Sequence, residues 1–201
     1  MRMKCKTKMR ILFIILIASI ASTQIIARTY HVENKQSKVS WLAKKIGGEH
    51  RGTIQVAEGL ITEKDGQLSG SISIDMNSIR VMDLQDPEKN AKLIGHLKSD
   101  DFFNTTAFPR ATLLITGSKN LGKNQYQING KLTIREKTNP VQFSAIIQIL
   151  QSEFKARGKM TIDRSKFNVK FRSASFFEGL GDKLIYDDFE LTFEVVARQV
   201  Q

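Results

Sequence analysis

The chain has 201 residues, with 31 basic and 20 acidic side chains that give a formal net charge of +11 at pH 7. Its single cysteine, Cys5, excludes an internal disulfide and, for the rest of the chain, a cysteine-ligated metal or a cysteine nucleophile. The basic residues are spread along the sequence without a compact run that interleaves aromatics, so we expect no nucleic-acid partner.

The N-terminal segment is typical of a secretory signal peptide. Residues 2–10 contain five basic and no acidic side chains, and residues 11–21 form a largely apolar run. This run is shorter than the roughly 20 residues of a membrane-spanning helix, although an uncleaved anchor is the alternative. We assign residues 1–27 to the signal peptide, with cleavage after Ala21 as a second option, and residues 28–201 to the mature domain. The protein is therefore expected to be periplasmic or secreted.

The first strands follow the leader. Alternating apolar and polar residues predict half-buried strands, because successive side chains of a strand point to opposite faces. This pattern covers residues 29–33 and 38–44, which form one strand or a strand pair, and then residues 50–61 and 67–76. Turn residues between these segments make them an antiparallel meander.

A helix is predicted over residues 87–98. Asp86 can cap its N-terminus, Pro87 fits the first turn, and Leu93 and Leu97 lie on one apolar face. The following loop, residues 99–109, carries three phenylalanines and is too apolar to be only a connection.

The alternation then returns and continues to the C-terminus. Strands are predicted over residues 110–118, 125–134, 141–150, 154–162 and 188–198. Residues 163–187 form a second aromatic-rich loop between the last two strands. A sheet of this size must close on itself or stack on another sheet, because open edges invite aggregation.

Small residues recur on the apolar side of the predicted strands. They are Gly52, Gly70, Gly130, Gly158, Ala43, Ala111, Ala145 and Ala156. If this side is enclosed, small residues leave open volume for a ligand. The alternative explanation is that glycines in strands mark bulges and close approaches of the backbone. This explanation fits the alanines less well.

Several short motifs occur together in a fixed order. They are Ser37-x-Val39-x-Trp41, His50-x-Gly52, the segment from Leu97 to Phe103, Phe108-Pro109-x-Ala111, the segment from Gly130 to Ile134, and Ile162-Asp163-Arg164. In this order the chain resembles the YceI-like family over nearly the whole mature domain. The resemblance implies a mostly β fold: a single antiparallel eight-stranded lipocalin-like barrel with a short helix and two aromatic-rich loops. One departure is Arg135, where such proteins often have glycine, and it puts the local turn in doubt.

The resemblance also implies an apolar tunnel that binds an amphiphilic isoprenoid lipid, such as a polyisoprenoid or a quinone, with no metal or other cofactor. We expect the tunnel lining to include Trp41, Ile54, Ile72, Ile74, Leu97, Phe102, Phe103, Phe108, Leu113, Ile115, Ile134, Phe143, Ile147, Met160, Phe171, Phe176, Phe177 and Phe193. The loop aromatics among these could form a mouth or lid, or could plug the barrel as ordinary core. Transient contact with a membrane surface and a homodimer are both compatible with the sequence.

Catalytic and metal-binding motifs are sparse. The three histidines are widely separated and lack metal-ligand spacing, and Asp163-Arg164 is interpreted as a structural ion pair. We therefore expect a binding protein that acts in transport, storage or stress protection. Two alternatives stay open: a structural barrel with a filled core, and an enzyme that acts on an isoprenoid lipid through a pocket residue such as His50 or Asp75.

Overall fold

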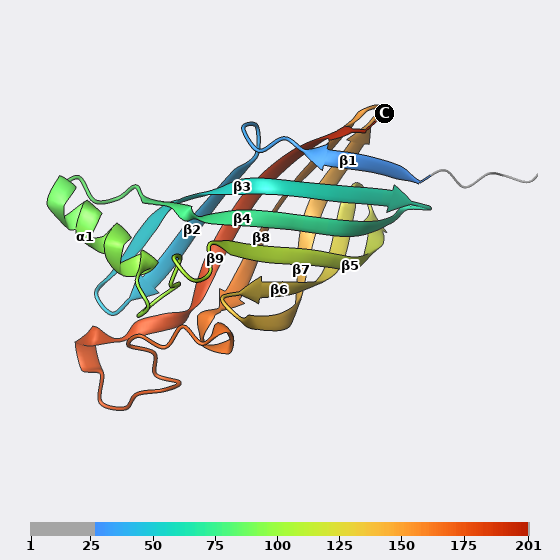
Figure 1. Cartoon of the computed structure of the whole chain (residues 1–201). Coiled ribbons are helices and arrows are strands. Elements are labelled where there is room, and N and C mark those ends of the chain that lie inside the picture. The colour runs from blue at the N-terminus through green and yellow to red at the C-terminus, as the bar shows by residue number, and fades with distance from the viewer. Residues whose placement is uncertain (1–26, 201) are drawn as a thin grey trace, which may run out of the picture.

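The computed structural model describes residues 27–200, so the predicted signal peptide lies outside the described residues except for its last position. The strands are β1 (Arg28–Val32), β2 (Lys38–Lys45), β3 (Gly48–Lys64), β4 (Gln67–Val81), β5 (Arg110–Gly122), β6 (Gln125–Ile134), β7 (Lys137–Leu150), β8 (Glu153–Asp163) and β9 (Ile185–Gln199). The helical segments are α1 (Pro87–Lys98) and two short 3-10 helices, η1 (Arg164–Phe167) and η2 (Gly181–Lys183) (Figure 1).

The strands β2 to β9 close into an eight-stranded antiparallel barrel. Each pairs with the next along the chain, and β2 pairs with both β3 and β9, which closes the ring. The extra strand β1 also lies between β3 and β9, beyond the start of β2. Thus β1 and β2 occupy one position of the barrel in succession, separated by a turn in which the Ser37 N–H donates to the Glu33 carbonyl. The predicted fold class is confirmed.

The two ends of the barrel differ. At one end the hairpin connections are two residues long, and Asp65, Lys123 and Gln151 in them adopt positive φ angles. At the other end lie α1 and the two long loops, as Figure 1 shows. We call these the closed end and the mouth end. At the closed end the side chains of Tyr30 and Phe154 are fully buried, with ring centroids 5.7 Å apart, and they fill the interior there.

The helix α1 has the predicted bounds. The side chain of Asp86 accepts hydrogen bonds from the backbone N–H groups of Glu88 and Lys89, and Pro87 occupies the first turn. This cap satisfies donors that a helix N-terminus leaves without partners. Leu93 and Leu97 pack against the barrel core, so the helix covers part of the mouth end.

Some strands run further than the alternation predicts. β4 continues to Val81, whereas the sequence pattern ends at residue 76, and β3 extends to residue 64. The pairing of β3 with β4 shifts register between Thr53 and Gln55 and again between Val56 and Glu58. These irregularities break the period of two, so a strand can continue while its sequence pattern stops.

The inward glycines allow close approach of neighbouring strands. A Cβ atom on Gly52 would overlap the carbonyl oxygen of Arg80, and one on Gly70 would overlap that of Leu60. Gly70 also has a φ of 138°, which L side chains rarely adopt. The close approach of neighbouring strands therefore explains Gly52 and Gly70, and their small size does not indicate open volume inside the barrel.

Candidate lipid tunnel

The barrel encloses two apolar chambers that share four lining residues. The shared residues are Val39, Ile74, Leu132 and Leu191, which come from four strands and which we call the waist. The chamber on the mouth side, the mouth chamber, has a volume of about 120 Å³, and the inner chamber has a volume of about 100 Å³. Because they share the waist, the two chambers adjoin inside the barrel, and we refer to them together as the tunnel.

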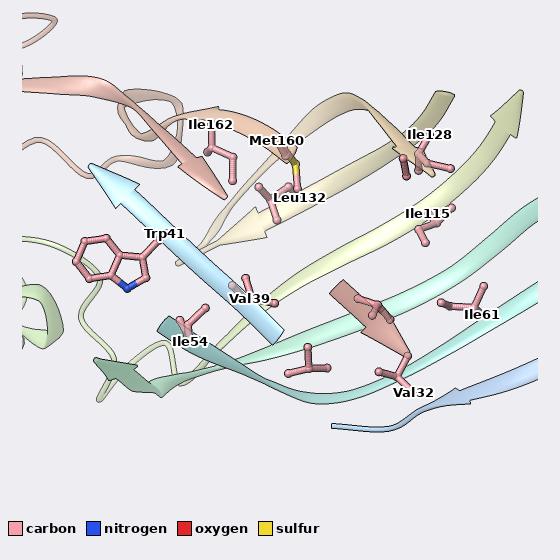
Figure 2. Packing of buried hydrophobic residues seen from close by; sticks show 14 of the residues in the cluster. Val32, Val39, Trp41, Ile54, Ile61, Ile115, Ile128, Leu132, Met160 and Ile162 are labelled. Carbon is pink, nitrogen blue, oxygen red and sulfur yellow. The ribbon is translucent and has the colours of Figure 1, made fainter. Parts of the chain in front are cut away.

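The mouth chamber lies between the barrel wall and the long loops. Besides the waist it is lined by Trp41, Ala43, Ile54, Met76, Ile79, Leu97, Phe102, Phe103, Ala111, Ile134, Ile162, Arg164, Ile185, Tyr186 and Phe189. Figure 2 shows Trp41 and Val39 on one strand, facing Leu132 and Ile162 across the interior. Tyr186 lines this chamber and is also exposed, so the chamber approaches the protein surface beside it.

The inner chamber is lined by aliphatic and aromatic side chains and the thioether of Met160. Besides the waist these are Val56, Ile61, Leu68, Ile72, Leu113, Ile115, Ile128, Phe143, Ala145, Ile147, Phe154, Ala156, Met160, Phe193 and Val195. Such a space has no hydrogen-bond partner for water. By comparison, an engineered cavity of about 150 Å³ with a similar lining stays dry and binds benzene.

The small inward residues fall into two groups. The four alanines line the tunnel, with Ala43 and Ala111 in the mouth chamber and Ala145 and Ala156 in the inner chamber. None of the four inward glycines lines either chamber. The open volume therefore lies beside the alanines.

A buried arginine stands in the wall of the mouth chamber. Arg164 is only 4% exposed, and burial lowers the pKa of its guanidinium against the opposing effect of Asp187. Its Nε donates to the carbonyl of Tyr186, its Nη1 donates to the carbonyls of Val169 and Phe171, and its Nη2 donates to that of Ile185.

The acid that accompanies this arginine is distant in sequence. Arg164 Nη2 lies 3.3 Å from Asp187 Oδ1. The predicted pairing of Arg164 with Asp163 is wrong, because Asp163 instead caps η1 and accepts from the Ser165 N–H. An arginine has five N–H donors. Four of them donate to these carbonyls, and the remaining Nη2 donor lies beside Asp187 in an ion pair without a hydrogen bond. Arg164 therefore organises the second loop through four carbonyls, and Asp187 balances its charge.

The two long loops meet over the mouth end. We call residues 99–109 and 164–184 the lid segments. The ring of Phe102 lies 5.4 Å from that of Phe171, and the imidazole of His96 contacts both rings edge-on, at 5.0 and 4.5 Å. Aromatic pairs at these separations attract one another. Both lid segments are thus joined to the end of α1.

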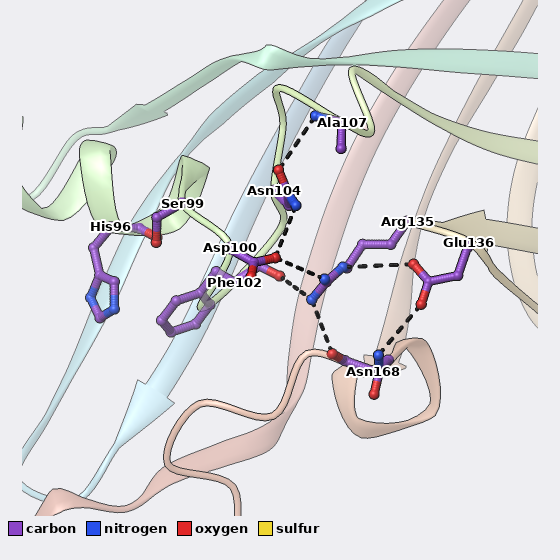
Figure 3. A network of polar contacts seen from close by, with 9 residues as sticks. All are labelled: His96, Ser99, Asp100, Phe102, Asn104, Ala107, Arg135, Glu136 and Asn168. Atoms are coloured by element: carbon purple, nitrogen blue, oxygen red, sulfur yellow. Dashed lines mark hydrogen bonds and ion pairs between the residues drawn. The ribbon is translucent and has the colours of Figure 1, made fainter.

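A second arginine holds the lid segments from the β6–β7 turn. Nη1 of Arg135 donates to the carbonyls of Phe102 and Asn168, at 3.2 and 3.1 Å, and Nη2 lies 3.2 Å from Asp100 Oδ1 (Figure 3). The guanidinium also lies 5.6 Å from the centroid of Phe108. This side chain therefore links both lid segments to the barrel.

Arg135 adopts a backbone conformation that favours glycine. Its φ is 54°, which is uncommon for a residue with a Cβ and costs on the order of 1 kcal/mol. The sequence departure at this position does not prevent the hairpin, since β6 and β7 pair up to Ile134 and Lys137. The arginine keeps the turn and adds the contacts to the lid segments.

The structure places most of the predicted lining residues in the tunnel. Fourteen of the eighteen line one or both chambers, and Phe108, Phe171, Phe176 and Phe177 do not. Phe108 packs under Arg135, and Phe171 packs against His96. Phe176 and Phe177 are exposed.

The sequence prediction also omitted some lining residues. Four omitted strand residues line the chambers, namely Val39, Phe189, Leu191 and Val195. They belong to the same alternation, so the sequence pattern could have assigned them to the inner face. Arg164 was also missed as a lining residue, and no periodic signal marks it because it lies in η1, beyond the end of β8.

Polar candidates from the sequence lie outside the chambers. His50 Nδ1 is 2.8 Å from Asp83 Oδ2, and Asp75 is 3.6 Å from Arg110, but neither His50 nor Asp75 lines a chamber.

Two further searches cover residues 27–200 only. Within this range no three His, Cys, Asp or Glu side chains gather closely enough to hold a metal ion. None of the helices described there has the length and apolar character needed to cross a membrane.

Comparison with known proteins identifies related sequences. A YceI-like domain model matches residues 30–197. Protein YceI of Shigella flexneri is 30% identical over 129 residues, which cover 59% of this chain and 63% of the relative. A UPF0312 protein of Shewanella denitrificans is 30% identical over 95 residues, which cover 43% of this chain and 47% of the relative. The chain thus spans less than two thirds of the length of these curated relatives.

Solved structures share the fold. BcnA of Burkholderia cenocepacia superposes with a TM-score of 0.63 at 23% identity, over 82% of this chain and 98% of BcnA. A polyisoprenoid binding domain from Saccharophagus degradans, implicated in plant cell wall breakdown, gives a TM-score of 0.63 at 13% identity, over 85% of this chain and 98% of that domain. At these identities the likeness concerns the barrel architecture.

Proposed function

The chain belongs to the YceI-like family, and on this premise we propose that it is an exported, non-catalytic protein that holds an isoprenoid or other amphiphilic lipid inside its barrel. The observation that carries the proposal is the apolar tunnel, which runs from the lid segments through the waist to a closed end filled by Tyr30 and Phe154. The solved relative described as a polyisoprenoid binding domain supports this class of ligand.

The volume of the tunnel sets the length of tail that it can hold. If about 150 Å³ holds the six carbons of benzene, chambers of about 120 and 100 Å³ hold roughly nine carbons between them. At roughly 0.8 kcal/mol for each buried methylene, this gives about 7 kcal/mol, or a dissociation constant near 10 μM before ordering costs. A longer tail must therefore displace lining side chains or extend beyond the mouth end.

An isoprenoid tail suits such a narrow tunnel. Its double bonds and methyl branches leave fewer rotamers to lose than a straight acyl chain of the same carbon number, and immobilised rotamers reduce affinity. Leu132 and Leu191 at the waist are unbranched at Cβ and can change rotamer to let a longer tail pass.

A catalytic role finds little support in the lining of the tunnel. Among the described residues that line the chambers, the side chains with polar atoms are Trp41, Arg164, Tyr186 and the thioether residues. All donors of Arg164 already contact carbonyls or Asp187. We therefore favour storage, transport or stress protection of a lipid in the cell envelope, with export directed by residues 1–27.

The proposal is tested by titrating the purified protein with a prenyl alcohol of two isoprene units. Trp41 is the only tryptophan of the chain and lines the mouth chamber, so its fluorescence reports binding there. We expect a saturable change at one ligand per chain, and weaker binding of a straight-chain alcohol with the same number of carbons. No saturable change up to the solubility limit of either alcohol would favour the structural barrel with a filled core.

A further inference from the structure

The exposed aromatic side chains of residues 27–200 gather at the mouth end. They are Phe176, Phe177 and Tyr186, with exposed fractions of 42%, 49% and 47%. The two phenylalanines lie in the second lid segment, which projects outside the ring of strands, and Tyr186 follows this segment at the start of β9 (Figure 1). Exposed apolar side chains that gather in one place mark a surface that binds a partner or a membrane, whereas scattered ones are ordinary surface.

The two phenylalanines are held in a defined turn. The N–H groups of Phe176 and Phe177 both donate to the carbonyl of Ser173, a fully buried residue, at 3.1 and 3.0 Å. The hydroxyl of Ser175 donates to Asp187 Oδ2 at 2.7 Å, which joins the turn to β9 beside the exposed tyrosine. An ordered backbone therefore presents the rings to solvent, so little conformational entropy is lost when they bind.

Positive charge surrounds the three aromatic rings. Nζ of Lys170 lies 5.1 Å from the centroid of the Phe176 ring. The turn between β2 and β3 lies alongside, because the N–H of Ile46 donates at 3.0 Å to the last carbonyl of the second lid segment. Residues 44–49 and 165–186 together carry six basic and three acidic side chains, and all six basic residues are exposed. We call the exposed side chains of these two ranges the mouth patch.

An anionic lipid surface fits the mouth patch better than a second copy of the chain does. In a two-fold contact the patch would face itself, which would bring its basic side chains together. Anionic headgroups attract such side chains, and each Lys or Arg near the surface strengthens binding about five-fold. Aromatic rings are stabilised at the boundary between headgroups and acyl chains, so the two features of the patch favour the same partner.

We propose that the mouth patch docks the protein on an anionic lipid bilayer, with Phe176 and Phe177 inserted among the headgroups. Ile185 and Tyr186 also line the mouth chamber, so docking brings the chamber close to the bilayer. A role of docking in lipid uptake rests on the proposed function, whereas docking itself requires no ligand in the tunnel.

The test is co-sedimentation with vesicles of equal parts phosphatidylglycerol and phosphatidylethanolamine. The double variant Phe176→Ser/Phe177→Ser should bind them about 10- to 100-fold more weakly than the wild type, because it removes two half-exposed rings that the bilayer would bury. Leu121→Ser/Leu150→Ser is the matched control, since it removes two side chains of similar exposure, 51% and 58%, beside the closed end. The control should bind as the wild type does. All proteins are expressed with residues 1–27 and purified alike, so any contribution of that segment is common to them.

A second variant tests the charge of the patch and does not depend on the folding of the first. Lys170→Gln/Lys183→Gln should weaken binding to the anionic vesicles about 25-fold and leave binding to vesicles of phosphatidylcholine unchanged. Equal binding of the wild type and this variant to the anionic vesicles would refute the proposal.

Three further results would also overturn docking. The first is a wild type that does not sediment with the anionic vesicles, and the second is a phenylalanine variant that sediments as the wild type does. The third is a wild-type dimer, seen by analytical ultracentrifugation, that the phenylalanine substitutions dissociate, because the patch would then be an interface between copies. The prenyl alcohol titration separates the two proposals: if the alcohol binds and the vesicles do not, docking is refuted and the proposed function stands.

Discussion

Replacing Ala156 by leucine should close the inner chamber to a lipid tail without altering the mouth chamber. Ala156 lines only the inner chamber and is half-buried, so its methyl group faces open space. Leucine adds three carbons, which fill most of a volume of about 100 Å³ that holds roughly four. The leucine side chain then occupies the space that the end of the lipid tail would otherwise fill.

The expected loss follows from the carbons that can no longer enter. Four methylene-sized groups at roughly 0.8 kcal/mol each amount to about 3 kcal/mol, or about 200-fold in the dissociation constant. In the wild-type protein a prenyl alcohol with two isoprene units should bind about 200-fold more tightly than one with a single unit, whose tail fits the mouth chamber. In Ala156→Leu this gain should disappear.

The assay is a titration of both alcohols by Trp41 fluorescence or calorimetry. Arg157→Leu is the control, because Arg157 is the exposed neighbour on the same strand and points to the outer face. The single-unit alcohol should bind equally to all three proteins. If Ala156→Leu weakens both alcohols alike, or weakens neither, the tail does not pass the waist and the tunnel account is refuted.

Three other perturbations test the parts that hold the tunnel together. Arg164→Met should lower the free energy of unfolding by about 3 to 5 kcal/mol, measured by denaturant titration, because it leaves Asp187 without its counter-charge and four carbonyls without their donor. A loss below about 1 kcal/mol would contradict a stabilising role for these contacts. Arg135→Gly should relieve the strained φ but release the lid segments. Amide hydrogen exchange should then quicken in residues 99–109 and 164–184 and stay unchanged at the closed end. If the lid segments exchange at the same rate in the variant and the wild type, Arg135 does not link them to the barrel. Asp83→Asn tests a pKa: burial raises the pKa of Asp83, but hydrogen bonds from the Arg51 N–H and His50 outweigh it, so the net pKa is below its ordinary value of 3.8. Ionised Asp83 then stabilises the fold above pH 3.8, so the wild type should be more stable than Asp83→Asn there. As the pH falls below 3.8, this difference in stability should shrink. Thermal melts in which the difference between the two proteins does not change with pH would refute this.

Regular parts of the fold could be predicted because their signal is local. The period of two in β2 to β9 and the cap of α1 at Asp86 both depend on neighbouring residues, and the structure has them where the pattern indicates. The pattern fails where β3 and β4 shift register, because the extra residues at a bulge depend on the partner strand.

The tunnel lining could be predicted on the strands and less well in the loops. On a strand such as β9, alternation alone assigns Phe193 to the inside. In the lid segments no period exists, so the side chains of Phe102 and Phe171 look equivalent in the sequence, although the first lines the mouth chamber and the second packs outside it.

Contacts between residues that are far apart in the sequence could not be predicted from local patterns. Asp163 stands beside Arg164 in the sequence, but the partner of this arginine is Asp187, which lies beyond the second loop. In the same way, inward glycines and alanines look alike in a strand pattern. Only the approach of a neighbouring strand distinguishes Gly52, which packs against backbone, from Ala156, which faces the inner chamber.

The measurement that tests the central claim most directly is native mass spectrometry of the full-length protein, expressed with its N-terminal segment and purified from the cell envelope without detergent. The account predicts one apolar molecule per chain, released by organic solvent and retained at a lower level or with a shorter tail by Ala156→Leu. A wild-type protein that carries no such molecule, and takes none up from an extract of envelope lipids, would contradict it.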